Sequence, residues 1–166
     1  MLIRVSLALI VSALLITGMF LSSAQNSLNA PLNLGSELRV FEVRQGDGLI
    51  RVLNALESEA LVESATKIRV GLGLRSKSLV VKRGEYQLVE GESVLELLER
   101  MDRNDVILYP ITIPEGVTFR WFLTALWEHP QLARVLDDPQ DKRLLSLIQP
   151  YASPEGLFLP ETYLIQ

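Results

Sequence analysis

PEGLFLPETY, residues 154–163, sets one carboxylate, that of Glu155, between a stiff proline and a permissive glycine. Such a loop can aim a carboxyl at a groove. The residues that follow, above all Phe158 and Tyr163, are largely apolar or aromatic. Apolar neighbours reduce the hydration of a carboxyl and disfavour its charged form, which suits a general acid near neutral pH. The stretch predicts a loop with Glu155 as a candidate catalytic acid, although the triplet alone also fits a solvated loop glutamate.

A helix and an extended segment are predicted ahead of this stretch. Ser93 and Glu96 have capping-box spacing, and apolar residues recur at helical spacing up to Met101. Residues 106–113 are predicted to be extended, and Pro110 within them favours an edge strand or a bulge.

Two more helices are predicted between that extended segment and the PEGLFLPETY stretch. Thr118 is a candidate N-cap for a helix that ends at His129, because the proline that follows disfavours helix there. Asp138, with proline at the next position, is predicted to begin another helix that runs to Pro150.

The N-terminus carries an uncharged apolar run over residues 5–21, preceded by Arg4. Its length nearly matches a hydrocarbon core of about 30 Å. Residues 1–24 are therefore predicted to be a transmembrane anchor with its N-terminus in the cytoplasm. A cleaved signal peptide is the alternative, because Ser22, Ser23 and Ala24 offer small residues for cleavage. Both interpretations place the rest of the chain outside the cytoplasmic membrane.

A linker and a small module are predicted next. Residues 25–36 are rich in Asn, Ser, Pro and Gly without a regular period, which favours a short linker. Residues 37–90 show the order strand, helix, helix, strand, with the last strands expected over 78–82 and 85–88. The stretch VRQGDGLIRVL, residues 43–53, resembles a LysM-type module. That resemblance implies binding of glycans that contain N-acetylglucosamine, while a spacer of the same topology is the alternative.

Composition excludes several kinds of chemistry in the 166 residues. The chain has no cysteine and one histidine, so disulfides, thiolate sites and multi-histidine metal sites are not expected. The net charge of -4 gives no basic footprint for nucleic acid and argues against an electrostatic membrane binder. Neither a metal nor an organic cofactor is predicted, and the chemistry must depend mainly on carboxylates.

PEGLFLPETY resembles the EGxFxPDTY-like signature of the MltG (YceG-like) endolytic murein transglycosylases. The stretches VKRGEYQLVEGESVLELLERM, residues 81–101, and VILYPITIPEGVTFR, residues 106–120, resemble the segments that precede it in that family. The resemblance implies that Glu155 is the catalytic residue and that Glu115 has a structural role in a turn. Glu161 stands where the family usually has aspartate, and Leu157 where it often has tryptophan.

The resemblance implies cleavage of the β-1,4 bond between N-acetylmuramic acid and N-acetylglucosamine within peptidoglycan glycan strands. A glycosidase usually needs two carboxylates. A lytic transglycosylase can use one, which protonates the departing oxygen and then takes the proton of the muramic C6 hydroxyl. The product is a 1,6-anhydromuramoyl end.

The predicted fold class is α+β: a transmembrane helix, a βααβ module, and over residues 91–166 the first part of a catalytic domain. Because nothing after Tyr163 covers the apolar face around Phe158, the chain is expected to stop short of a complete domain and to have little activity alone. The predicted location is the bacterial inner membrane, single-pass, with the C-terminal portion in the periplasm.

Two other functions fit the same sequence. One is a non-catalytic, membrane-anchored protein that binds peptidoglycan through its LysM-like module. The other is an interaction protein whose membrane helix docks to wall-synthesis machinery, with peptidoglycan synthases as partners.

Overall fold

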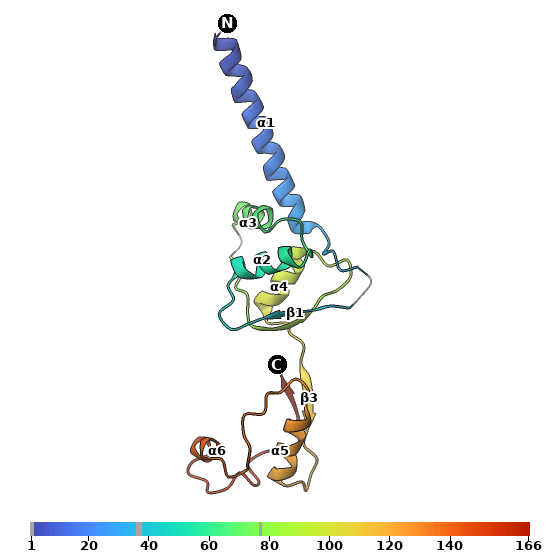
Figure 1. The fold of residues 1–166 in the computed structure, drawn as a ribbon, viewed down its shortest axis with the longest axis vertical. Helices are drawn as coiled ribbons and strands as arrows, with labels where there is room; N and C mark the ends of the chain where they lie inside the picture. Colours follow the sequence, from blue (N-terminus) through green and yellow to red (C-terminus); the bar gives the residue numbers. More distant parts are fainter. Residues whose placement is uncertain (1, 36–37, 77) are drawn as a thin grey trace. The chain divides into compact units, whose positions relative to one another are not determined.

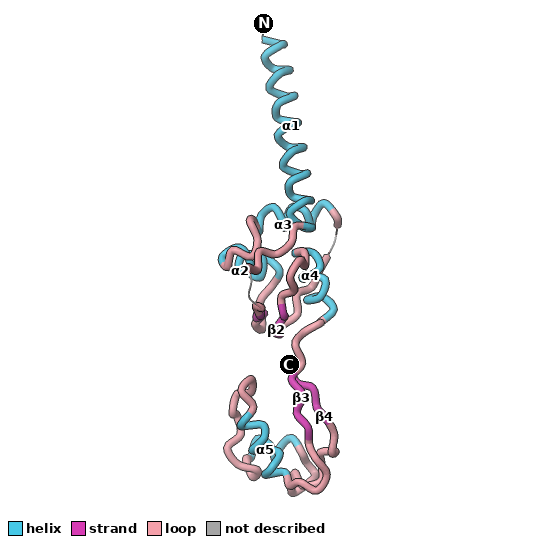
Figure 2. The backbone as a smooth tube through the Cα atoms, turned by 90° about the vertical axis from the view of Figure 1, so that its right-hand side faces the viewer, coloured by secondary structure: helices cyan, strands magenta, loops and turns pink. Residues whose placement is uncertain are grey.

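The computed structural model describes residues 2–35, 38–76 and 78–166, with the backbone alone for residues 2–6 and 8. The chain divides into two compact units, residues 1–107 and residues 108–166. We call them the first and the second unit (Figures 1 and 2). Both combine helices with a two-stranded antiparallel sheet, which confirms the predicted α+β class.

Helix α1, Leu2–Asn29, contains the apolar run predicted at the N-terminus. The part Leu9–Asn29 is long and apolar enough to cross a membrane, as a membrane anchor or a signal sequence would be. The side chains of residues 9–20 are exposed to the surroundings. With no core to cover them, these side chains suit a lipid environment.

The last turns of α1 belong to the core of the first unit. Ala24 and Leu28 are fully buried. Leu32 and Leu34, in the segment that follows the helix, are nearly so. The linker predicted over residues 25–36 is therefore corrected in its described part: its first five residues are helical, and its leucines pack inside. The polar composition of the segment concealed a stripe of leucines. Residues 36 and 37, where the predicted linker meets the predicted module, lie outside the described residues.

The order strand, helix, helix, strand predicted for the module is confirmed. The elements are β1, Val40–Val43; α2, Leu49–Ser58; α3, Ala65–Leu74; and β2, Gly84–Gln87. Strands β1 and β2 pair antiparallel, with Val40 opposite Gln87 and Val43 opposite Gly84. Residues 78–82, predicted as a strand, are not one, because Val80 donates its N–H to the Asp102 carboxylate instead of to a strand partner.

Helix α4, Val94–Arg103, begins with the predicted capping box. The Ser93 hydroxyl accepts the Glu96 N–H, and the Glu96 carboxylate accepts the Ser93 N–H at 2.8 Å. Its apolar face packs into the core of the first unit, which also contains Leu28 of α1. The domain boundary predicted at residues 90/91 therefore moves to 107/108. An amphipathic pattern shows that a helix has a buried face but not which partner covers that face.

The second unit contains β3, Tyr109–Thr112; α5, Phe119–Glu128; α6, Lys142–Leu147; and β4, Thr162–Ile165. Thr118 caps α5, and α5 ends before His129, as predicted. Helix α6 begins later than the prediction from Asp138. Asp138 accepts the Gln140 N–H within a turn of its own, and Asp141 then caps the helix. The core consists of buried apolar side chains from β3, α5, α6 and the segment after β3, against which Tyr163 and Ile165 of β4 pack: Ile111, Ile113, Phe119, Phe122, Leu123 and Leu144.

Candidate functional site

Glu155 lies at the tip of a tight turn. The Leu157 N–H donates to the Pro154 carbonyl oxygen at 3.3 Å, and Gly156 has a φ of +75°. A left-handed glycine at the third of the four turn positions is typical of a type II turn. The Glu155 N–H donates to the Ser153 hydroxyl at 3.2 Å, which fixes the entry to the turn. The PEG triplet therefore determines the backbone from which the Glu155 carboxylate projects.

The carboxylate of Glu155 is held by the first turn of α5. Its Oε2 accepts the backbone N–H of Phe119 at 2.9 Å. The first N–H groups of a helix have no partner within the helix, and the positive end of the helix dipole favours an anion there. Thr118 serves another of these groups, because its hydroxyl accepts the Trp121 N–H at 3.2 Å. The helix end is thus capped by two side chains, one of which is the predicted catalytic residue.

Pairing of β3 with β4 brings the two PEG-containing segments together. Thr112 lies opposite Thr162, and their hydroxyls are 2.9 Å apart. The ladder continues past the strands, since the Ile113 N–H donates to the Glu161 carbonyl oxygen at 2.9 Å. The first turn of α5 follows β3 in the chain, and the Glu155 turn precedes β4. The sheet therefore explains why residues so far apart in sequence meet.

An aromatic cluster forms the floor beside Glu155. The ring of Phe158 stacks on that of Phe119, with centroids 5.4 Å apart, and lies 5.2 Å from that of Phe122. A small pocket of about 60 Å³ opens here; it is lined by Ile113, Val117, Thr118, Phe119, Phe122, Pro154, Glu155, Gly156 and Phe158. Glu155 itself is exposed. The apolar surroundings predicted for it are therefore present on one side only, and the loss of hydration expected for the carboxyl does not follow from this geometry.

The other residues singled out from the sequence lie around this turn. Tyr163 donates its hydroxyl to the Leu159 carbonyl oxygen at 3.2 Å and packs against the core of the second unit. Leu157 and Glu161 are exposed. Glu115 occupies the tip of the first PEG triplet, where Gly116 has a φ of +77°. Within the described ranges, no three His, Cys, Asp or Glu side chains are placed to hold a metal ion together.

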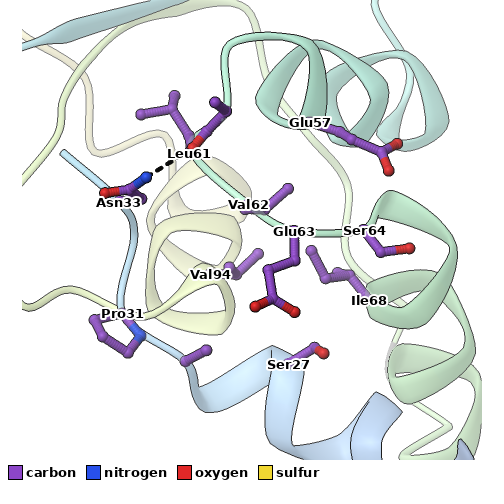
Figure 3. A pocket seen from close by; sticks show the side chains of 12 residues that line it. Ser27, Pro31, Asn33, Glu57, Leu61, Val62, Glu63, Ser64, Ile68 and Val94 are labelled. Atoms are coloured by element: carbon purple, nitrogen blue, oxygen red, sulfur yellow. Dashed lines mark hydrogen bonds between the residues drawn. The ribbon is translucent and has the colours of Figure 1, made fainter.

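The first unit has a hollow of its own, of about 550 Å³ (Figure 3). Buried side chains of Leu61, Val62, Ile68 and Val94 line its inner side. Its rim is polar, and the carboxylate of Glu63 points into it. The segment after α1 is hydrogen-bonded to the segment after α2 at this rim, since the Asn33 backbone N–H donates to the Leu61 carbonyl oxygen at 3.0 Å. No pattern in the sequence predicts this hollow, because its lining combines single residues of α1, α2, α3 and α4 with the segments that follow α1 and α2.

A comparison with known families settles the assignment. The model of the YceG-like family matches residues 41–166, which is most of the chain and includes the whole described second unit. The chain belongs to the YceG-like family. The expected resemblance is thereby confirmed, and this family includes lytic transglycosylases. The match takes in the βααβ elements as well as the Glu155 turn, so both units carry YceG-like sequence.

Comparisons with individual proteins add less. No curated protein matches the sequence. A crystal structure of a yceG-like protein, lmo1499 from Listeria monocytogenes, is similar at 18% identity with a TM-score of 0.39, and covers 80% of this chain and 49% of that one. The chain thus spans about half the length of that solved YceG-like structure.

The partner that holds Glu155 was not predictable from the residue types. The partner is a backbone N–H, which has no signature in the residue type at position 119. The signal that was present is the N-cap at Thr118, which implies unpaired N–H groups in the next turn. What the sequence lacked was the pairing of β3 with β4 that places those groups beside residue 155.

Proposed function

We propose that the protein is an endolytic murein lytic transglycosylase, in which Glu155 acts first as general acid and then as general base. Membership of the YceG-like family over residues 41–166 supports this proposal. The observation that carries it is the placement of Glu155, on a rigid turn at the first turn of α5 and above an aromatic floor. A reactive carboxylate must be held in place by its neighbours to act efficiently.

The proposed reaction uses one carboxyl and the substrate's own hydroxyl. Glu155 gives its proton to the glycosidic oxygen as the bond from that oxygen to the muramic anomeric carbon breaks. The C6 hydroxyl oxygen of the same sugar then bonds to the anomeric carbon, and its proton returns to Glu155. One glycosidic bond to the anomeric carbon is replaced by one internal acetal bond to the same carbon, and no water is consumed. The resulting 1,6-anhydromuramoyl end would terminate a glycan strand during cell-wall assembly.

The aromatic floor gives this site a surface for a sugar. Phe158 presents more than a third of its surface to solvent, while Phe119 and Phe122 beneath it are nearly buried. An apolar ring face next to polar groups suits the apolar face of a pyranose. The Thr118 hydroxyl lies in the same lining and can orient a hydroxyl or an acetamido group.

The proposed location is the bacterial inner membrane, with a single span and with both units in the periplasm. Packing at the end of α1 supports a retained anchor over a cleaved signal. The helix runs without interruption through residues 22–24, where cleavage was considered, and Ala24 and Leu28 on either side of that point are both fully buried. Cleavage after Ala24 would remove a core residue. Peptidoglycan strands are the proposed substrate, and peptidoglycan synthases in the same membrane are proposed partners.

The test is murein digestion by the protein expressed from its own gene. We expect Glu155→Gln to lower formation of anhydro ends roughly 100- to 10,000-fold, as for loss of a general acid. Glu115→Gln is the matched control, because it changes the same residue type in the other PEG turn and leaves the site intact. Equal loss in both variants, or no loss in either, would contradict the role of Glu155.

Wall binding without catalysis is the second candidate, and the hollow of the first unit favours it. Its polar rim and apolar inner side suit a glycan. In a pull-down with insoluble murein, Ala30→Trp should fill the hollow and reduce binding, whereas Ala133→Trp in the second unit should not. If the hollow does not bind the wall, the two variants will bind equally.

A further inference from the structure

The charge of the chain is unevenly distributed. Residues 65–84 contain six basic side chains and no Asp or Glu, although the whole chain has a net charge of -4. The basic residues are Lys67, Arg69, Arg75, Lys77, Lys82 and Arg83. The net charge of the whole chain does not reveal such a block. Net charge alone therefore does not exclude electrostatic binding to a membrane.

Helix α3, the first half of this block, packs directly on the end of α1. A Cβ on Gly71 would lie 2.5 Å from the Ala24 carbonyl oxygen and 2.9 Å from Leu28, so only glycine permits this approach. Just past α3, Arg75 donates to the Asn29 side-chain oxygen at 3.3 Å. Both views of the fold show α3 as the element of the first unit nearest to the N-terminal part of α1 (Figures 1 and 2).

The depth of this contact can be estimated from helix geometry. The apolar run of α1 ends at Leu21, and Gly71 of α3 meets α1 three residues later, at Ala24. Three residues of helix span about 4.5 Å. The headgroup layer on each side of a bilayer is roughly 5–8 Å thick. With the apolar run in the hydrocarbon core, α3 therefore lies at the level of the lipid headgroups.

The surface of α3 suits that level. Leu74 is exposed over 44% of its surface, and Val70 is half-buried. Lys67 pairs with Glu63 at 3.7 Å, whereas Arg69 and Arg75 form no ion pair with any described residue. A guanidinium group matches the geometry of a phosphate, and an apolar side chain beside it can enter the acyl boundary.

We propose that α3 lies on the membrane surface and binds anionic phospholipid headgroups through Arg69 and Arg75, with Leu74 entering the interface. The proposal rests on retention of α1 in the bilayer. Together, α1 and α3 would fix the orientation of the first unit against the membrane instead of letting it swing on a tether. The hollow of the first unit, whose lining includes Ser27 of α1 and Ile68 of α3, would then open close to the membrane.

The absence of native cysteine permits a direct test with single labels. The full chain with Leu74→Cys, or with Val40→Cys on β1 as control, is labelled with a fluorophore and reconstituted into vesicles of phosphatidylglycerol and phosphatidylcholine. A quencher attached to the lipid headgroup reports contact. We expect strong quenching at position 74, weak quenching at 40, and weaker quenching at 74 in pure phosphatidylcholine or at high salt.

Removing the two guanidinium groups tests the lipid contact itself. With both Arg69→Gln and Arg75→Gln present, the ratio of docked to undocked α3 should fall roughly 30-fold in anionic vesicles. Resistance to carbonate extraction first establishes that α1 is inserted. Extraction by carbonate would overturn the anchor and this inference with it, whereas insertion with equal quenching at 74 and 40 would overturn this inference alone.

Discussion

The Phe119 backbone N–H donates to the Glu155 carboxylate at 2.9 Å, across 36 residues of sequence. The contact makes the proposed catalytic residue a cap of helix α5. The position of the carboxylate and the stability of the helix end are therefore coupled, and a change in one should be detected in the other.

Removal of the other cap of α5 should affect both properties. Thr118→Ala deletes the hydroxyl that accepts the Trp121 N–H. Loss of an N-cap costs about 0.5–2 kcal/mol, so the second unit should unfold at lower denaturant concentration. Formation of anhydro ends should fall as well, because the frayed turn no longer fixes Glu155. Thr118→Ser keeps the hydroxyl and should restore both; rescue of stability without rescue of activity would show that α5 does not position Glu155.

The stacked ring of Phe158 should matter more than the neighbouring leucine. Phe158→Ala removes two ring contacts that together are worth about 1–3 kcal/mol. We expect a lower rate of murein cleavage, because the loop that carries Glu155 loses its packing against α5. Leu159 is the control, since it is exposed over 67% of its surface. A larger effect of Leu159→Ala than of Phe158→Ala, measured as anhydro ends formed per minute, would contradict this role.

Two glycines of α3 allow a matched test of the α1–α3 contact. Gly71→Ala places a methyl group against the Ala24 carbonyl oxygen, and overpacking of this kind costs about 1–3 kcal/mol. An added Cβ at Gly73 meets nothing within 4 Å, so Gly73→Ala should be neutral or stabilising by about 0.5–1 kcal/mol. Thermal unfolding in detergent distinguishes them. Similar melting temperatures for the two variants would show that α1 does not pack on α3.

Asp141 should give the second unit a dependence on acid pH. Hydrogen bonds from the Arg143 side chain and backbone N–H lower the pKa of Asp141 from 3.8 to about 2. A carboxyl with a lowered pKa stabilises the fold above its unfolded pKa, and this contribution is lost as the pH falls through the folded pKa. The difference in melting temperature between the wild type and Asp141→Asn should therefore be constant above about pH 4 and shrink towards pH 2. The titration of the Asp141 carboxyl carbon, followed by NMR, should show a midpoint near pH 2. A midpoint near pH 4 would contradict the ion pair with Arg143.

The sequence predicted features that depend on neighbouring residues. The Ser93–Glu96 capping box, the Thr118 cap and the βααβ order are all present, because each is set by contacts within a few residues. The helix expected from Asp138 begins at Lys142, because two aspartates compete for the same role and Asp138 forms a local turn.

Features that depend on distant contacts were not predictable in the same way. The leucines at 28, 32 and 34 are hidden in a polar segment, and α4 joins the first unit because that unit covers its apolar face. For Glu155, the residue and its turn followed from local sequence. Its helix-end partner and its exposure depend on the pairing of β3 with β4.

The oxygen content of the product ends distinguishes a transglycosylase from a hydrolase. Murein is digested by the natural protein in water labelled with heavy oxygen, and the new glycan ends are read by mass spectrometry. We expect 1,6-anhydro ends without the label, which disappear in Glu155→Gln and persist in Glu115→Gln. Reducing ends that carry the label, or anhydro ends that persist in Glu155→Gln, would contradict a transglycosylase that acts through Glu155 alone.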